Sequence, residues 1–222
     1  MTARSGSILI GRVRSLQVGR TAPLPWRGKA VPSAIVKHPV DGPVYLGFEG
    51  FAGDEQADRS VHGGVDKAVC AYPLEHLPRW SRELGTELPP GAFGENLSVA
   101  GLLEDRVYIG DTFALGEATV QVNQPRAPCY KIAARWGHKS LPDLMAKAGM
   151  SGFYLRVLEE GHVRAGDRLA LTDRRSDVTV AEVMRLIYRD RRDREGLARV
   201  LAVPELAAGW HVSVEKMLRR IA

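Results

Sequence analysis

One cysteine in this sequence stands among residues that would make its thiol reactive. Cys129 lies in the segment Gln124 to Lys131, which reads QPRAPCYK, so Arg126 and Lys131 bring positive charge close to it. Nearby cations lower the pKa of a thiol, and the thiolate is the form that attacks electrophiles or binds soft metal ions. The two prolines restrict the backbone and argue against a plain strand. The alternative is a small buried hydrophobic residue, and these residues alone leave both interpretations open.

Two other segments carry polar residues next to glycines. The first, His62 to Lys67, has paired glycines that let backbone amides approach a ligand, with a histidine and a lysine suited to an anion such as phosphate. The second, Phe93 to Asn96, places a carboxylate and an amide beside a glycine, which suits polar ligand contacts. Each could instead be a structural turn. The second cysteine, Cys70, lies in the apolar run Ala68 to Ala71, which favours a role in core packing.

Several familiar catalytic classes are excluded by their motifs. The sequence contains no GxGxxG fingerprint in a βαβ context, no phosphate-binding GxxxxGK(S/T) loop and no HExxH pair. Its six histidines are scattered and lack the spacing of a structural zinc site. The glycine-rich segments therefore do not predict a common nucleotide-binding fold.

The composition is that of a globular protein. The 222 residues are 45% hydrophobic and 26% charged, with a net charge of +5, and the length suits one domain of roughly 100–200 residues with an appendage. Residues 174–222 hold 11 Lys and Arg against 7 Asp and Glu, but both signs are interleaved there, so nucleic-acid binding is not predicted. The sequence has neither an apolar run of the ~18 residues that a membrane span needs nor a signal peptide. Two cysteines are too few for a disulfide framework, and we expect a soluble cytoplasmic protein.

Up to about residue 172 the hydrophobic runs are short, rich in Val, Ile and Tyr, and separated by Gly, Pro and Asp. Such runs predict strands and tight turns, and many of them at close intervals predict a barrel or sandwich. Gly110-Asp111 is expected to form a hairpin turn. The expected strands are Ile8–Val18, Ser33–Lys37, Lys67–Tyr72, Val107–Ile109, Thr112–Leu115, Ala118–Asn123, Phe153–Leu158 and Arg168–Leu171.

The spacing of apolar residues predicts two helices within this part, at 73–84 and 142–148. After Ser176 the pattern becomes helical throughout. Thr179 to Glu182 forms a capping box that would start one helix, Asp193 would cap a second through Leu201, and Ser213 would cap a third. We therefore expect a β domain over residues 1–173 and an α-helical domain of three helices over residues 174–222.

An ordered set of motifs resembles the MOSC domain, named for the C-terminal part of molybdenum cofactor sulfurase. The motifs are HGGVDKAV at 62–69, FGENL at 93–97, GD at 110–111 and QPRAPC at 124–129. Within that superfamily the sequence is most similar to the bacterial YiiM-type proteins, which protect against N-hydroxylated bases. Gly28-Lys29 with SAI at 33–35 and Lys37 resembles the N-terminal motif of that group, and SDVTV at 176–180 resembles the start of its three-helix domain. The resemblance implies a mainly β fold: a MOSC-type β-barrel with a few helices, followed by a small C-terminal three-helix domain.

The resemblance also implies a bound molybdenum cofactor in its molybdopterin form, with Cys129 as the molybdenum ligand and catalytic residue. A soft thiolate suits such a metal centre. The cationic residues of the implied site would neutralise the pterin phosphate or tune the centre, and the others would line the pocket. The implied cofactor-binding residues are Lys29, His62, Gly63, Lys67, Asn96, Arg126 and Cys129.

The implied reaction is the reductive dehydroxylation of an N–OH group, as in 6-N-hydroxylaminopurine, to an amine and water. Because no flavin, nicotinamide or iron–sulfur motif is visible in the sequence, a separate reductase, a flavoprotein, is the expected electron donor. Two other classes stay open: a carrier or insertion protein that holds the cofactor or sulfur on Cys129 without turnover, and a nucleic-acid-binding module that uses the Arg-rich tail. Bound molybdenum without turnover would indicate the first, and salt-dependent oligonucleotide binding the second. No membrane partner is expected.

Overall fold

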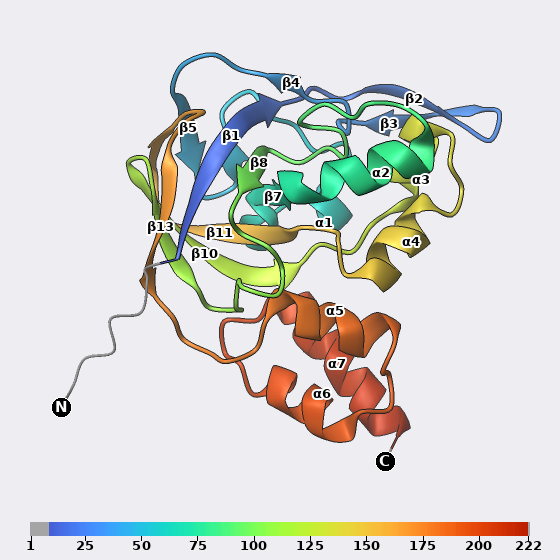
Figure 1. The fold of residues 1–222 in the computed structure, drawn as a ribbon, viewed down its shortest axis with the longest axis vertical. Coiled ribbons are helices and arrows are strands. Elements are labelled where there is room, and N and C mark those ends of the chain that lie inside the picture. The colour runs from blue at the N-terminus through green and yellow to red at the C-terminus, as the bar shows by residue number, and fades with distance from the viewer. Residues whose placement is uncertain (1–8, 222) are drawn as a thin grey trace.

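The computed structural model describes residues 9–221, and its centre is a closed barrel of seven strands (Figure 1). The strand order is β13-β9-β10-β11-β7-β8-β1, and β1 pairs with β13 to close the ring. All neighbours are antiparallel except β7 and β8, which run parallel. The barrel strands are β1 (Ile10–Val18), β7 (Val69–Pro73), β8 (Leu97–Ala100), β9 (Thr112–Leu115), β10 (Ala118–Pro125), β11 (Phe153–Glu159) and β13 (Arg168–Asp173).

Alternating side chains explain why these segments form a barrel. Along β11, Phe153, Leu155 and Val157 are buried in the main core, whereas Tyr154 and Arg156 between them are only partly buried. Successive side chains of a strand point to opposite faces, so one face of β11 fills the barrel and the other is free to build a site. The predicted barrel is confirmed. Ile8, the first residue of the predicted N-terminal strand, lies outside the described residues, as does the start of the predicted 1–173 domain.

Shorter strands decorate the barrel. β4 (His38–Pro39) extends the sheet beside β1, β5 (Val44–Gly47) joins β6 (Gly50–Phe51) and β12 (Gly161–Val163), and β2 (Ala22–Trp26) pairs with β3 (Lys29–Ser33) as a projecting hairpin (Figure 1). The strand expected over Ser33–Lys37 is wrong, because β3 ends at Ser33 and the next residues are irregular. The hairpin itself went unpredicted, since its prolines obscure the strand pattern.

The strand expected over Val107–Ile109 is also wrong. These residues pair with the chain that leads into the C-terminal helices: Ile109 N–H donates to Val178 O at 2.9 Å, and Val180 N–H donates to Val107 O at 2.9 Å. Only an isolated bridge, between Tyr108 and Thr179, results. The run of apolar residues correctly predicts that this segment is buried. It does not predict which segment forms hydrogen bonds with its backbone.

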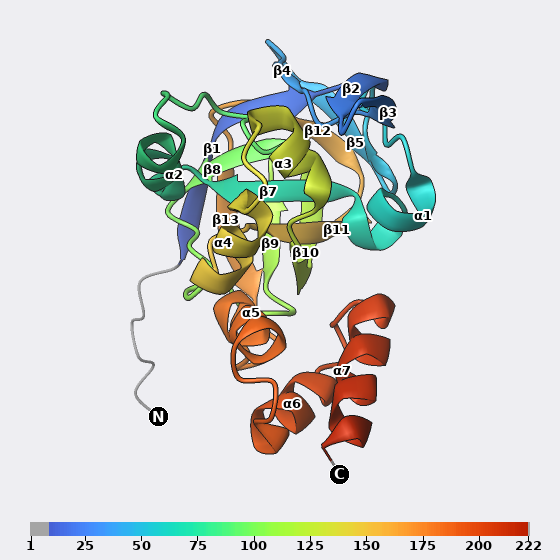
Figure 2. The same cartoon turned by 90° about the vertical axis from the view of Figure 1, so that its right-hand side faces the viewer.

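Helices cover the barrel on the side of its irregular loops (Figure 2). They are α1 (Arg59–His62), a 3₁₀ turn at Val65–Lys67, a second 3₁₀ turn at Leu74–His76, α2 (Leu77–Leu84), α3 (Tyr130–Trp136) and α4 (Leu141–Ala148). The helix predicted from residue 73 begins four residues later, because Pro73 belongs to β7 and Pro78 occupies the first turn of α2. Proline suits that position, since the first-turn amides have no partner inside a helix.

Three helices form the C-terminal part: α5 (Val180–Tyr188), α6 (Arg194–Leu201) and α7 (Ala208–Arg220). The Thr179 hydroxyl caps α5 by accepting from Glu182 N–H at 3.0 Å, and Asp193 caps α6 by accepting from Gly196 N–H at 2.9 Å, both as predicted. The predicted start of the last helix at Ser213 is wrong. α7 begins at Ala208, and the Ser213 hydroxyl lies within it and donates to the carbonyl of Gly209.

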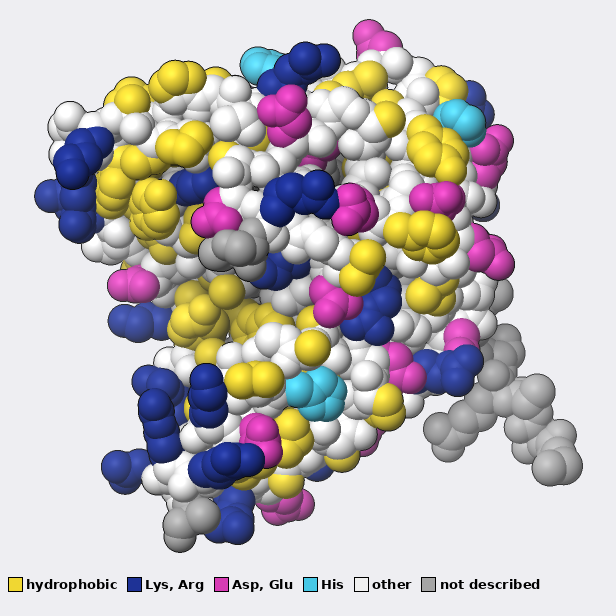
Figure 3. Space-filling model, turned by 180° about the vertical axis from the view of Figure 1, so that it is seen from behind, with side chains coloured by type: hydrophobic (Ala, Val, Ile, Leu, Met, Phe, Trp, Pro, Cys, Tyr) yellow, Lys and Arg dark blue, Asp and Glu magenta, His cyan; other side chains and the backbone are white. Residues whose placement is uncertain are grey.

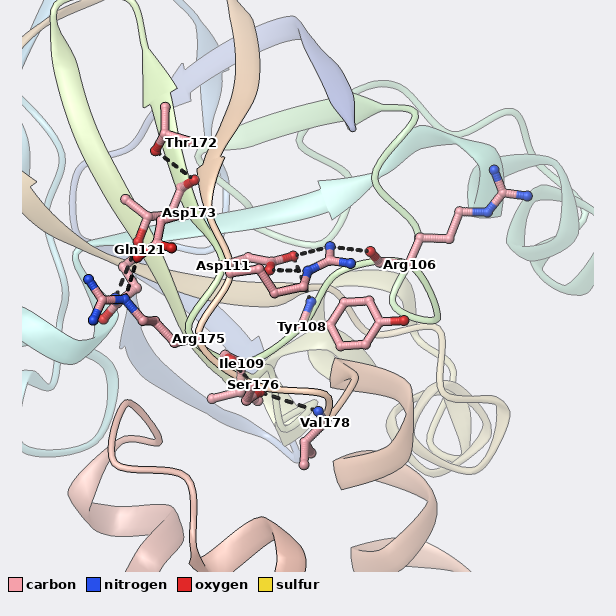
Figure 4. Close-up of polar contacts among 12 residues, drawn as sticks. Arg106, Tyr108, Ile109, Asp111, Gln121, Thr172, Asp173, Arg175, Ser176 and Val178 are labelled. Atoms are coloured by element: carbon pink, nitrogen blue, oxygen red, sulfur yellow. Dashed lines mark hydrogen bonds and ion pairs between the residues drawn. The ribbon is translucent and has the colours of Figure 1, made fainter. Parts of the chain in front are cut away.

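Polar contacts fasten the barrel to the segment that leads into the three helices (Figure 4). Arg174 forms a two-pronged ion pair with buried Asp111, through N–O distances of 2.7 and 2.8 Å, and its guanidinium lies 3.8 Å from the centroid of the Tyr108 ring. The Ser176 hydroxyl donates to Ile109 O at 2.6 Å. β13 ends at Asp173, but the hydrophobic core runs on from the barrel into the helices, and the domain boundary at 173/174 stays a prediction. Within residues 9–221, no helix is long and apolar enough to cross a membrane.

Candidate functional site

Cys129 lies in the wall of a pocket outside the barrel, in the segment that connects β10 to α3. The strand ends at Pro125, and after Pro128 the backbone of Cys129 stays extended, at φ −110° and ψ 166°, directly before the helix. Its carbonyl accepts from Ile132 N–H at 3.1 Å, while its side chain makes no capping hydrogen bond. The half-buried thiol is therefore held at the pocket surface and is not used to stabilise the helix.

Arg126 supplies a buried positive charge three residues before the thiol. Its backbone N–H donates to Gly152 O at 2.9 Å, and its Nη2 donates to the carbonyl of Phe93. Nη1 is buried and has no hydrogen-bond partner in the described structure. Burial alone lowers the pKa of this guanidinium, but the thiol and phenol groups around it raise the pKa on balance, so Arg126 stays charged. An unpartnered buried donor of this kind is costly unless a ligand satisfies it.

Two lysines add to this charge. Lys131, in the first turn of α3, is buried and lines the pocket, and within residues 9–221 no carboxylate forms an ion pair with it. Lys67 closes the 3₁₀ turn, which is fixed because the Asn123 side-chain amide donates to the carbonyl of Asp66 at 2.9 Å. Burial lowers the pKa of Lys67. The same pocket wall thus holds Arg126, Lys131 and Lys67.

His62 stands at the end of α1 and lines the same pocket. Burial, together with the positive charges of Lys131, Lys67 and Arg126, lowers its pKa to about 4. The imidazole is therefore neutral near pH 7 and adds hydrogen-bonding capacity without further charge.

Asn96 acts as a brace within the pocket wall. Its Oδ1 accepts from Cys70 N–H at 3.2 Å, and its Nδ2 donates to Asp54 Oδ2 at 2.8 Å. Asp54 also forms a buried ion pair with Lys37. Because both ends of the Asn96 amide are occupied, this residue orders the wall and contributes little free hydrogen-bonding capacity to a ligand.

Cys70 and Tyr154 face the pocket from neighbouring strands. They are directly paired between β7 and β11, and both line the pocket. Burial raises the pKa of each, so both keep their protons near pH 7. The prediction that Cys70 is a packing residue agrees with its burial, but its neighbour Tyr154 was missed. The alternation along β11 is the signal that could have placed Tyr154 outside the barrel core.

The structure brings together five of the residues that the sequence pointed to: His62, Lys67, Asn96, Arg126 and Cys129. Lys29 is exposed at the start of β3 and does not line this pocket. Gly63 lines a neighbouring cavity. Cofactor binding by these two residues stays a prediction. The Lys37–Asp54 pair and Lys131 belong to the wall although they were not in the predicted set. Among the described residues, no cluster of three or more His, Cys, Asp or Glu side chains is placed to hold a metal ion.

The fold is that of a known family. The MOSC domain matches residues 58–170, and the YiiM-like 3-alpha helix domain matches residues 178–220. The chain therefore belongs to the MOSC family and carries a YiiM-like three-helix domain, as its motifs predicted.

Its relatives include YiiM proteins. The chain is 42% identical over 188 residues to Protein YiiM of Escherichia coli, covering 83% of this chain and 84% of that protein, and 44% identical over 210 residues to the uncharacterized protein YflK of Bacillus subtilis, covering 94% and 95%. The crystal structure of YiiM from Geobacillus stearothermophilus superposes with a TM-score of 0.80 at 34% identity, covering 94% of this chain and 99% of that one. A Gibberella moniliformis protein named Reductase is 36% identical over 151 residues, which are 66% of this chain and 27% of that protein.

Proposed function

We propose that this protein is a molybdenum-cofactor-dependent reductase that converts N-hydroxylated purines and related N-hydroxylated compounds to amines, a detoxifying reaction. The observation that carries the proposal is that one pocket wall holds both the half-buried Cys129 thiol and the buried guanidinium of Arg126, whose Nη1 has no partner in the described structure. MOSC domains are associated with molybdenum cofactor binding. The fungal relative that bears the name Reductase supports redox chemistry on this scaffold.

The residues present fit such a cofactor. Cys129 offers the soft sulfur ligand that a sulfur-ligated molybdenum centre prefers. Arg126 and Lys131 offer buried positive charge without a carboxylate partner in the described part of the chain, which suits a pterin phosphate. Lys67 lies in the same wall. When bound, the cofactor would supply the two electrons that reduction of an N–OH group requires and would take up its oxygen.

The remaining requirement is protons, which this chain can supply. Converting R–NHOH to R–NH₂ and water consumes two electrons and two protons. Lys67 Nζ, with a pKa lowered by burial, can release a proton more readily than an exposed lysine. The Tyr154 hydroxyl, with its raised pKa, keeps its proton and can donate a hydrogen bond to the departing oxygen. His62, neutral near pH 7, can relay protons without adding charge.

The electrons must come from a partner. Because the chain carries no flavin, nicotinamide or iron–sulfur motif, we place a separate flavoprotein reductase upstream of this protein. The matched region is 27% of the fungal relative named Reductase, so most of that protein lies outside the part that resembles this chain.

The test is to express the chain with intact cofactor synthesis, measure molybdenum and pterin, and follow reduction of 6-N-hydroxylaminopurine with a chemical electron donor. We expect stoichiometric molybdenum and turnover. Cys129→Ala should lose molybdenum and at least about 99% of the activity, because burial raises the pKa of Cys70, the other thiol in the pocket wall, and keeps it protonated. The melting temperature of the variant should change by no more than a few degrees. Full activity in that variant would overturn the assignment of Cys129. Bound molybdenum without turnover in the wild type would instead favour the carrier or insertion function.

A further inference from the structure

A second cavity lies between the barrel and the C-terminal helices, next to the Cys129 pocket. From the barrel it is lined by the segment around Lys67 and by Gln124 and Ala127, and from the helices by Tyr188 and Trp210 among others. In Figure 3 a hollow separates the barrel from the C-terminal helices, with hydrophobic side chains inside it and Lys or Arg along its edges. Its volume of about 460 Å³ falls within the ~300–1,000 Å³ range of small-molecule sites.

The two cavities meet at one residue. Lys67 lines both of them. Ala127 in the wall of the second cavity is only two residues from Cys129. The second cavity therefore adjoins the pocket that holds the thiol, with Lys67 at the boundary between them.

The C-terminal helices contribute two aromatic side chains to this cavity. Tyr188 is the last residue of α5, and Trp210 lies in the first turn of α7, where it packs against the main core. Both are partly buried, and neither contacts another aromatic ring within residues 9–221. The Trp210 indole N–H makes no hydrogen bond to the described residues. Aromatic surface beside polar groups such as Gln124 and Asp66 suits a flat heterocycle with polar edges.

The aromatic wall is fixed relative to the Cys129 pocket. Ala207 N–H, directly before α7, donates to Asn123 O at 2.9 Å. The Asn123 side chain in turn donates to Asp66 Oδ1 at 3.0 Å. One residue of β10 thus holds both the start of α7 and the turn that carries Lys67.

We propose that this cavity binds the purine ring of the substrate, with Tyr188 and Trp210 as the stacking surface that makes the C-terminal helices a specificity element. The proposal rests on the proposed function for the identity of the reactive N–OH group. It adds where the substrate binds: the base lies in the second cavity, and the N–OH group lies on the side of Lys67.

The first test compares substrates. Trp210→Leu and Tyr188→Leu should each raise KM for 6-N-hydroxylaminopurine by about tenfold, as expected for the loss of one stacking contact, with little change in kcat. KM for N-hydroxyurea, which has no ring, should stay unchanged. Tyr45→Leu, which removes an exposed tyrosine of β5 outside both cavities, is the matched control and should behave like the wild type.

The second test does not need turnover. Adenine should quench tryptophan fluorescence of the purified protein in a saturable manner, and Trp210→Leu should abolish this quenching. Saturable quenching in a protein that reduces neither substrate would support the cavity while the proposed function fails. Wild-type KM values in both leucine variants, without adenine quenching, would overturn the cavity while the reductase function stands. A loss of bound pterin in Trp210→Leu would also overturn it, because the cavity would then hold the cofactor.

Discussion

Arg126 and His62 show how one pocket can hold one basic group charged and another neutral. Arg126 is surrounded by thiol and phenol groups that favour its charged form, whereas His62 is surrounded by cations that oppose protonation. These surroundings therefore enlarge the difference in pKa that a guanidinium and an imidazole already have. The pocket presents a positive charge to an anionic ligand and a neutral imidazole beside it.

The low pKa of His62 should make stability depend on pH. In the unfolded chain this histidine titrates near its ordinary value of 6.5, whereas in the folded chain its pKa is about 4. Between these values the unfolded state binds more protons, so the free energy of unfolding should fall as the pH is lowered from about 6.5 to about 4. Lys131, Lys67 and Arg126 oppose protonation there, whereas Asp58 favours it.

The measurement is urea denaturation of the wild type and His62→Gln at pH 7.0 and 4.5. Between these two pH values, the free energy of unfolding should fall less in the variant than in the wild type, by on the order of 1 kcal/mol. The difference is this small because solvent partly screens the imidazole. His38→Gln, in exposed β4, serves as the control. Identical pH dependence in His62→Gln and the wild type would contradict this account.

At the scale of elements, the sequence predicted those features that depend on local pattern. Alternation and apolar runs identified most barrel strands, and the Thr179 and Asp193 caps located α5 and α6. The sequence did not predict which distant segments pair with each other. An example is the segment Val107–Ile109, which pairs with the chain before α5. Ser213 resembled a cap because a serine before an apolar face carries the same local signal inside a helix as at its start.

Some residues of the candidate site could likewise be predicted from local sequence, and others could not. Cys129, Arg126 and Lys131 are close in sequence and could be predicted, whereas Tyr154 joins them because β11 pairs with β10 and with β7. The brace between Asn96 and Asp54 likewise joins residues 42 positions apart. Such contacts follow from sheet register, which no single segment of sequence encodes.

Strand pairing beside the site depends on Gly152. Its φ is +79°, and a Cβ at this position would lie 2.3 Å from the carbonyl oxygen of Ala71 in β7. Gly152→Ala should therefore push β11 away from β7 and lower the free energy of unfolding by about 3 kcal/mol or more. Gly137→Ala is the matched control, because its φ is +66° but nothing lies within 4 Å, and it should cost only about 1 kcal/mol. Equal losses in urea denaturation would show that backbone strain alone, without the clash, decides the result.

At the scale of the whole molecule, barrel and helices share one hydrophobic core. Val120 and Phe113 of the barrel belong to the same buried cluster as Val183 and Leu197 of the C-terminal helices. Neither part can be removed without exposing apolar surface of the other. We therefore expect the two parts to unfold as one cooperative unit, although the family comparison describes them as two domains.

The ion pair at the junction offers a way to test this cooperativity. Arg174→Met leaves the fully buried Asp111 carboxylate without its partner and should lower the free energy of unfolding by about 2 kcal/mol, less than for a fully buried pair because Arg174 is 37% exposed. The experiment uses a Trp210→Phe background, so that tryptophan fluorescence reports only on the part of the chain that contains the barrel. Far-UV ellipticity reports on the helices. Both signals should shift to the same lower urea midpoint. Separate midpoints would show that the two parts unfold independently.

The 3₁₀ turn at Val65–Lys67 has a consequence for how the protein can change over evolution. The amides of Asn123 and Gln124 hold this turn through the backbone carbonyl of Asp66. The residue at position 67 lines both the Cys129 pocket and the proposed base cavity. A single substitution at position 67 therefore changes the walls of two cavities at once, which makes this position a starting point for diversifying or redesigning substrate preference.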